Sequence, residues 1–134
     1  MNKNDLCLAA LAARKSAYTP YSGFNVGAAL LTKSGKVFTG CNIENSAFSP
    51  TVCAERVAVF KAVSEGERDF VAIAVAGGQG DDVTSAAYPC GVCRQVLSEF
   101  CSPDFAVLCV TDMDGGFEEY TLSDLLPKSF YLEK

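Results

Sequence analysis

The 134-residue sequence contains no histidine and no tryptophan, and only 20% of its residues are charged. Without histidine, a metal site must draw its side-chain ligands from cysteine or from carboxylates. No apolar stretch approaches the roughly 20 residues that a membrane-spanning helix needs. The run LCLAALAA near the start is short and lacks the basic beginning of a signal peptide. We therefore expect a cytoplasmic protein that does not associate with a membrane.

Basic charge is also scarce. Eleven Lys and Arg residues face sixteen Asp and Glu, which gives a net charge of −5 and a pI near 4.6. The basic residues are scattered singly or in pairs, whereas a nucleic-acid-binding domain normally gathers them into a patch against the phosphates. The sequence therefore disfavours polymeric nucleic acid as a partner.

Cysteine, in contrast, is plentiful, with seven residues. In a reducing compartment these residues are not expected to form a disulfide framework, and an odd number would leave one unpaired in any case. Buried thiols and metal ligands remain as the two explanations. We expect the packing role for four of them: Cys7, Cys41, Cys101 and Cys109.

The apolar pattern predicts a single domain over residues 1–134. Strands are expected at 24–31, 36–41, 71–76, 105–110 and 117–122, and helices at 5–18, from 51 or 52 to 65, at 91–100 and at 123–127. The continuous apolar runs VAIAVA and FAVLCV are typical of strands covered on both faces. The fold class is therefore α/β: a three-layer α/β/α sandwich with a central mixed five-stranded sheet.

A glycine-rich stretch, GGQGDDVTSAAYP at 77–89, lies between the third strand and the helix at 91–100. It lacks the flanking Lys and Ser/Thr, and the spacing, of a phosphate-binding loop. We interpret it as a flexible loop.

The segment VCAERVAVF at 52–60 predicts a buried helix that is apolar almost all round. Glu55 lies in its first turn, where an unpaired buried carboxylate would be costly. Cys53 stands two residues before it. Something near the start of this helix must compensate for the carboxylate.

A second segment, PCGVCRQ at 89–95, places Cys90 and Cys93 on one face of a helix start. The pair alone is compatible with redox chemistry, metal binding or packing. Together with Cys53 it offers three thiolates and one open position, as in a catalytic zinc site; a structural site would have four protein ligands. Cys101 lies at the far end of the same helix, roughly 15 Å away, so we expect water in the fourth position.

A zinc ion would supply the positive charge that Glu55 needs. Zinc lowers the pKa of bound water toward ~7, and a carboxylate within reach can then act as general base and, once protonated, as general acid. Positions i and i+2 do not share a face of a regular helix. We therefore expect Cys53 to lie at the helix entrance, where the chain is not yet regular.

At these residues the sequence resembles the zinc-dependent cytidine deaminases of the short-chain, homotetrameric type. The matching segments are FNVGAAL, CNIENSAF, TVCAER, PCGVCRQVLSEF and LLPKSF, in that order from about residue 20 to residue 130. Members of the wider superfamily carry a Cys or His ligand, an acid–base Glu two residues later and a subsequent PCxxC. The resemblance implies hydrolytic deamination of free cytidine and 2′-deoxycytidine, with release of ammonia, in pyrimidine salvage.

Carried over residue by residue, the resemblance implies one Zn²⁺ per chain, held by Cys53, Cys90 and Cys93, with a zinc-bound hydroxide that attacks C4 of cytosine. It implies that Glu55 shuttles protons to N3 and to the departing amino group. It also implies a set of residues that contact the substrate: Phe24, Asn42 and Glu44 at the pocket and ribose, the backbone N–H of Ala54 at the base, and Phe48 and Phe130 from neighbouring subunits.

Several positions depart from the family pattern. Tyr88 stands where Ser is common, Val92 where Ala is frequent, and Phe48 replaces a frequent Tyr. The loop at 77–88 also looks longer than usual. These differences leave the metal ligands untouched and bear on the pocket rim, the range of substrates and the subunit contacts.

Three thiolates would leave the zinc centre with a formal charge of −1, which weakens it as a Lewis acid. Arg56 follows Cys53 by three residues and Arg94 follows Cys90 by four, both same-face spacings on a helix. We expect one or both arginines to hydrogen-bond the thiolates and draw charge from them.

Three other functions compete with cytidine deamination. A deaminase of a cytosine-containing antibiotic of the blasticidin S type shares the CAE and PCxxC pieces, although Asn42 and Glu44 favour a nucleoside with a ribose. A structural zinc module without turnover would have no use for an open position beside Glu55. Polynucleotide editing is disfavoured by the acidic charge.

Overall fold

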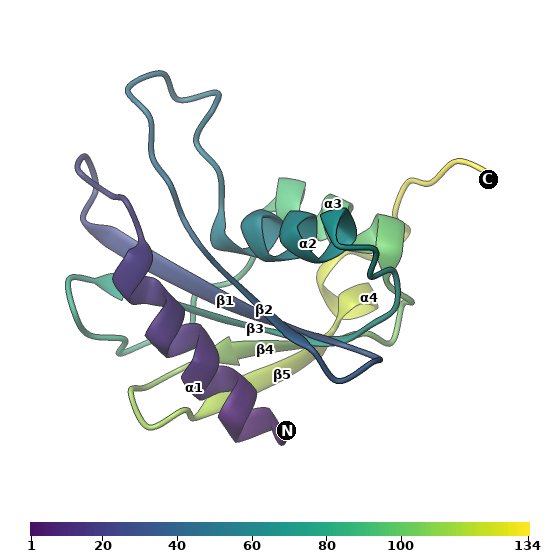
Figure 1. Cartoon of the computed structure of the whole chain (residues 1–134), viewed down its shortest axis with the longest axis horizontal. Helices are drawn as coiled ribbons and strands as arrows, with labels where there is room; N and C mark the ends of the chain where they lie inside the picture. The colour runs from purple at the N-terminus through teal and green to yellow at the C-terminus, as the bar shows by residue number, and fades with distance from the viewer.

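The computed structural model describes all residues, 1–134, and is built around one five-stranded sheet (Figure 1). The order is β2-β1-β3-β4-β5. The strands are β1 (Phe24–Thr32), β2 (Val37–Cys41), β3 (Phe70–Gln79), β4 (Ala106–Val110) and β5 (Phe117–Thr121). The β3–β4 pair is parallel and the other three are antiparallel, so the sheet is mixed, as predicted.

Helices cover both faces of this sheet (Figure 1). Helix α1 (Lys3–Ala13) packs on one face, and α2 (Ala54–Ser64) and α3 (Gly91–Phe100) lie on the other. A short helix, α4 (Leu122–Leu125), follows β5 directly. Each face has its own hydrophobic core, one centred on α1 and one on α2 and α3. The predicted three-layer architecture is therefore confirmed. No helix has both the length and the apolar character needed to cross a bilayer.

The central strands are apolar on both faces because both faces are covered. Every residue from Ala72 to Ala76 in β3 is buried, and so is every residue from Val107 to Val110 in β4. The continuous apolar runs of the sequence correspond to these two strands, as expected for strands between two layers of helix.

Two glycines on neighbouring strands let the helices approach the sheet closely. A Cβ added at Gly40 would lie 2.3 Å from the carbonyl oxygen of Ala54, at the start of α2. A Cβ at Gly27 would lie 2.1 Å from the carbonyl oxygen of Ala10 in α1. Both distances are far below van der Waals contact, so only glycine fits. The first turn of α2 is thus placed directly against β2.

Most element boundaries lie within two residues of the predictions, and a long-range pairing explains each of three other differences. Helix α1 ends at Ala13 and continues as a 3₁₀ turn at Arg14–Ser16, because Tyr18 already pairs with Ile43. Helix α2 begins at Ala54 instead of 51 or 52, because Val52 also pairs with Ile43.

The third difference concerns the glycine-rich stretch that we predicted to be a flexible loop from residue 77. Strand β3 runs on to Gln79, because Gly77 and Gly78 pair with β1. The irregular part of the chain therefore starts only at Gly80. Arg14 is buried below this turn and donates hydrogen bonds to the carbonyl oxygens of Gly78, Gly80 and Asp81.

Candidate active site

Cys53 stands at the entrance of α2 in the geometry that the sequence required. It is the N-cap residue, with extended backbone angles (φ −80°, ψ 155°), and its side chain makes no capping hydrogen bond. The preceding bridge between Val52 and Ile43 keeps the chain out of helical conformation up to this point. Cys53 and Glu55 can therefore approach the same point in space, although residues two apart on a regular helix cannot.

Cys90 occupies the corresponding place on α3. It is also an extended N-cap residue (φ −68°, ψ 167°) without a side-chain cap, and Cys93 follows in the first turn, where it is buried. Two helix N-termini thus meet at the three sulfurs. The partial positive charge at each N-terminus stabilises the negative charge of thiolates.

The sulfur geometry fits a tetrahedral ion. Sγ of Cys90 lies 3.7 Å from Sγ of Cys53 and 3.6 Å from Sγ of Cys93, and all three sulfurs lie within 4.8 Å of one another. Tetrahedral zinc with Zn–S bonds near 2.3 Å requires S···S separations of about 3.8 Å. No fourth Cys, Asp or Glu belongs to the group, and Cys101 lies outside it. Three protein ligands and one open position are the donor set of a catalytic zinc site.

Glu55 is buried beside this cluster, with only 4% of its surface exposed. Burial raises the pKa of its carboxyl group to about 7. No salt bridge offsets the buried carboxylate. A cation held by the adjacent sulfurs would supply that compensation.

The two arginines behave differently. Arg56 donates from Nη2 to Sγ of Cys53 at 3.4 Å, as predicted. Hydrogen bonds from Cys93 and from Arg56 lower the pKa of the Cys53 thiol to about 5. Nε of Arg56 is buried and has no partner.

Arg94, in contrast, donates to backbone carbonyl groups, so of the two arginines only Arg56 makes the expected hydrogen bond to a thiolate. Nε of Arg94 donates to the carbonyl oxygen of Pro89 at 2.7 Å, and its Nη1 donates to that of Leu125 at 2.6 Å. The guanidinium therefore ties the chain before Cys90 to the end of α4. Same-face spacing on the helix does not by itself bring Arg94 to a thiolate, because two nearby carbonyl groups accept the hydrogen bonds of its guanidinium.

A cavity of about 180 Å³ opens beside the sulfurs. Four of the residues predicted to contact substrate line it with Glu55: Phe24, Asn42, Glu44 and Ala54. Ala54 is the first residue of α2, and the N–H groups of a first turn have no acceptor within their own helix. Apolar side chains supply much of the remaining wall: Val26, Val52, Val75 and Ala87. We call the part of the cavity beside Glu55 and the sulfurs its reactive end, and the part beside Asn42 and Glu44 its polar end.

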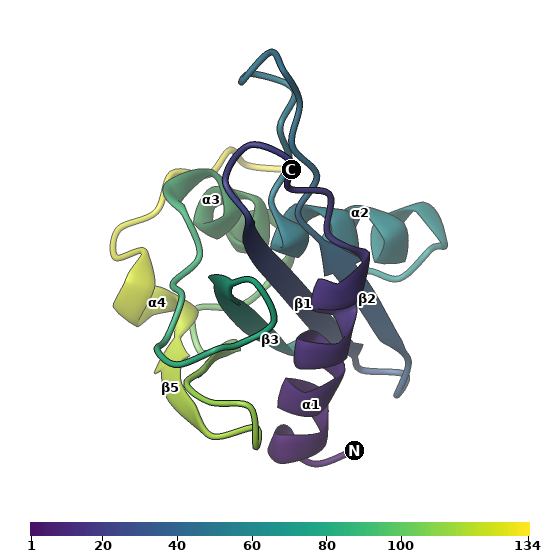
Figure 2. The same ribbon diagram turned by 90° about the vertical axis from the view of Figure 1, so that its left-hand side faces the viewer.

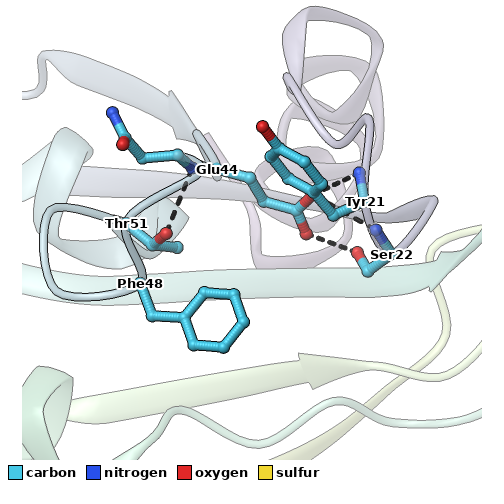
Figure 3. Close-up of a pocket in the computed structure, with 6 residues that line it drawn as sticks. Tyr21, Ser22, Glu44, Phe48 and Thr51 are labelled. Atoms are coloured by element: carbon cyan, nitrogen blue, oxygen red, sulfur yellow. Dashed lines mark hydrogen bonds between the residues drawn. The ribbon is translucent and has the colours of Figure 1, made fainter.

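Asn42 and Glu44, at the polar end of the cavity, are held by neighbouring loops and strands. Asn42 accepts from the N–H of Val26 at 2.9 Å and donates to the carbonyl oxygen of Phe24 at 2.8 Å, which leaves one donor and one acceptor site of its amide for a ligand. Glu44 accepts hydrogen bonds from the N–H groups of Tyr21 and Ser22 and from the Ser22 hydroxyl (Figure 3). The Ser22 hydroxyl, with the two N–H groups, lowers the pKa of Glu44.

A second cavity of about 350 Å³ adjoins the first, with Glu44 and Thr51 in both walls. Tyr21, Ser22, Asn45 and Phe48 complete its lining (Figure 3). Phe48 belongs to the 42–53 segment, which projects beyond the sheet (Figure 2), and 87% of its surface is exposed. The projecting segment therefore supplies one wall of this cavity, with the Phe48 ring largely open to solvent.

Phe130 lies away from the reactive cavity, in the C-terminal tail beyond α4. Its surface is 69% exposed, and its carbonyl oxygen accepts a hydrogen bond from Nε2 of Gln95 at 3.1 Å. Within one chain, the fold brings neither Phe130 nor Phe48 against Glu55 or the sulfurs.

Sequence reasoning missed several residues of the site. Tyr88 lines the reactive cavity, although the sequence marked it only as a departure from the family pattern. Thr51 lies in the walls of both cavities, and Tyr21 and Ser22 fix Glu44. The turn cluster TPYSG signalled a loop, but no local pattern showed that this loop would meet residue 44.

The comparisons with known proteins agree with this geometry. Residues 1–109 match the family described as "Cytidine and deoxycytidylate deaminase zinc-binding region". A cytidine deaminase of Sporosarcina psychrophila is 52% identical over 121 residues, covering 90% of this chain and 85% of that protein.

A crystal structure of cytidine deaminase from Burkholderia pseudomallei superposes with a TM-score of 0.88 at 46% identity, covering 97% of this chain and 100% of the other. A blasticidin-S deaminase of Bacillus cereus is more distant, at 36% identity over 110 residues, 79% of this chain and 76% of that protein. With its three sulfurs and buried glutamate placed at two helix N-termini, the chain belongs to the zinc-binding cytidine and deoxycytidylate deaminase family.

Proposed function

We propose that this protein is a zinc-dependent hydrolase that converts free cytidine and 2′-deoxycytidine into uridine and 2′-deoxyuridine. The observation that carries the proposal is the buried carboxylate of Glu55 beside three sulfurs with an open fourth position, in the wall of a cavity that Asn42 and Glu44 also line. The similarity to cytidine deaminases supports the same substrate class.

In the reaction, one water molecule and cytidine give uridine and ammonia. Zinc held by Cys53, Cys90 and Cys93 would supply Lewis acidity that favours ionisation of water. Glu55 accepts a proton from the attacking water and delivers it to N3, and then transfers the second proton of that water from the new C4 hydroxyl group to the leaving amino group. The C4–N4 bond breaks, a C4–O bond forms, and no redox step is needed. Because Glu55 is buried, bulk water does not compete for these protons.

The polar end of the cavity would hold the sugar. Glu44 offers a carboxylate and Asn42 an amide, and both can bond ribose hydroxyls. Phe24 would form an apolar wall for the base, and the N–H of Ala54 would donate to it. No Lys or Arg lines this cavity, which supports nucleosides over nucleotides as substrates.

The experiment that tests the function uses purified, zinc-containing protein. Mixing it with cytidine should produce the ultraviolet change of conversion to uridine, with release of one ammonia per uridine and a content of one zinc per chain. Full zinc content without any turnover of cytidine or deoxycytidine would refute the proposal and favour a structural zinc module. Equal efficiency on blasticidin S would favour the antibiotic-deaminase alternative.

We also propose that the active form is a homotetramer acting in cytoplasmic pyrimidine salvage, with residues 1–134 as one domain. The exposed aromatic rings of Phe48 and Phe130 support assembly, because each would be covered by a neighbouring subunit at its cavity. Seven cysteines without a disulfide support a reducing compartment. Light scattering of the purified protein tests the subunit number, and a monomer at working concentration would contradict it.

A further inference from the structure

A cluster of three side chains at the edge of the reactive cavity is not explained by zinc binding or by proton transfer. Tyr88 lines the cavity together with Cys53, Glu55 and Cys90, and 52% of its surface is exposed. Its hydroxyl donates to Oε1 of Glu118 at 2.8 Å. The hydroxyl of Tyr120 donates to the same oxygen at 2.7 Å.

These contacts fix the ring of Tyr88. The rings of Tyr88 and Tyr120 pack edge to face, with centroids 6.0 Å apart and an interplanar angle of 69°. Glu118 and Tyr120 belong to β5, so the irregular segment before Cys90 is tied to a regular strand. A side chain held at its hydroxyl and along its ring presents a rigid wall to a ligand.

The chemistry of cytosine indicates which edge of the base meets this wall. N3 and the exocyclic amino group must face Glu55, and O2 needs a hydrogen-bond donor, so the only apolar edge is C5–C6. Tyr88 is two residues from Cys90, at the reactive end of the cavity, whereas Asn42 and Glu44 are at the polar end. C5 is bonded to C4, the carbon that reacts, and therefore lies at the reactive end too.

We propose that Tyr88 is a specificity-determining residue that limits the size of substituents at C5 of the pyrimidine, and that Glu118 positions it. The inference rests on the proposed function and deepens it by defining the substrate class: cytosine nucleosides with hydrogen or a small group at C5. Removing the ring opens space at C5, and releasing the ring from Glu118 opens it in part.

The experiment compares 5-iodocytidine with cytidine as the ratio of their kcat/KM values. Tyr88→Ser should raise that ratio roughly tenfold or more, since hydrophobic pockets discriminate groups of this size by ~10–200-fold. Glu118→Ala should raise it by a smaller factor. Glu118→Gln should keep the wild-type ratio, because its amide oxygen still accepts from both hydroxyls. The affinities of uridine and 5-iodouridine, measured by calorimetry, should change in parallel.

Glu119→Ala is the matched control. Glu119 is the next residue on β5, points to the opposite face and pairs with Lys3 on α1, so this variant should keep the wild-type ratio. Tyr88→Ser with bound zinc and an unchanged ratio would overturn the inference. If Tyr88→Ser does not fold, an unchanged ratio in Glu118→Ala overturns it instead. Wild-type protein that fails to deaminate cytidine would refute the proposed function itself, a distinct result.

Discussion

The reactive end of the cavity and its polar end, which we also call the loop end because a loop carries Asn42 and Glu44, are built on different principles. At the reactive end, Cys53, Glu55, Cys90 and Cys93 stand on the first turns of two helices packed against the sheet. At the loop end, Asn42 and Glu44 stand at the start of the 42–53 segment, which projects beyond the sheet (Figure 2) and forms a bridge to Tyr18 through Ile43.

This difference matches the demands on the two ends. Bond making needs groups held within a few tenths of an ångström, which regular elements with buried neighbours provide. Recognition of a sugar needs polar groups that remain accessible until a ligand, or a neighbouring subunit, covers them. Substitutions at the reactive end should therefore reduce the chemical step, and substitutions at the loop end should weaken substrate binding.

The largest effect is expected from Glu55→Gln. The amide keeps the size of the side chain but cannot carry protons, and general acid–base catalysis contributes ~10²–10⁴-fold. We expect kcat to fall by roughly that factor, with zinc content and unfolding temperature close to wild type. Turnover by the zinc-loaded variant at the parent rate would show that another group carries the protons.

Gly40→Ala tests whether the packing of α2 on β2 positions the reactive end. The added Cβ would lie 2.3 Å from the carbonyl oxygen of Ala54 and 2.6 Å from the N–H nitrogen of Ala58, so the first turn of α2 must shift. Overpacking of this kind costs roughly 1–3 kcal/mol. We expect a lower unfolding temperature and a lower kcat. Gly91→Ala is the control, because a Cβ there meets no atom within 4 Å. Equal behaviour of the two variants would contradict the prediction.

Arg56→Gln and Arg94→Gln separate charge at the sulfurs from support of the backbone. Outer partners of metal ligands typically affect metal affinity or activity by ~10–100-fold. Because Arg56 donates to Sγ of Cys53, its replacement should weaken zinc binding and turnover within that range. Arg94 bonds two carbonyl groups, so its replacement should mainly lower stability. Zinc titration by chelator competition distinguishes them; unchanged zinc affinity and turnover in Arg56→Gln would refute the charge-withdrawal role.

The sequence predicted the reactive end more fully than the loop end, and the reason is physical. The spacing of Cys53, Glu55 and the Cys90–Cys93 pair reflects helix starts, which are local structures with local signals. The layered fold followed from apolar runs for the same reason. Arg94 bonds Leu125, Glu44 bonds Ser22 and Tyr88 bonds Glu118, partners that lie 31, 22 and 30 residues away in the chain. Such contacts depend on how the elements pack, and no pattern within a short window encodes them.

Among these substitutions, Glu44→Gln should have the smallest effect on activity. That effect should be on substrate binding, as expected for a residue at the loop end. The amide oxygen can still accept from the loop, but the charge that strengthens hydrogen bonds to sugar hydroxyls is lost. We expect KM for cytidine to rise about tenfold with kcat nearly unchanged, a hydrogen bond to a charged group being worth more than a neutral one.

The pH dependence of Glu44 has a definite sign. Because hydrogen bonds from Ser22 and Tyr21 lower its pKa, Glu44 keeps its charge down through the ordinary glutamate range near pH ~4.3. Its contribution to binding is present above that range and is lost only as the pH falls through the lowered pKa. The KM difference between wild type and Glu44→Gln should therefore be constant from pH 8 to about pH 5, with the exposed Glu65→Gln as control. A fall in kcat with unchanged KM would place Glu44 at the reactive end and erase the distinction between the two regions.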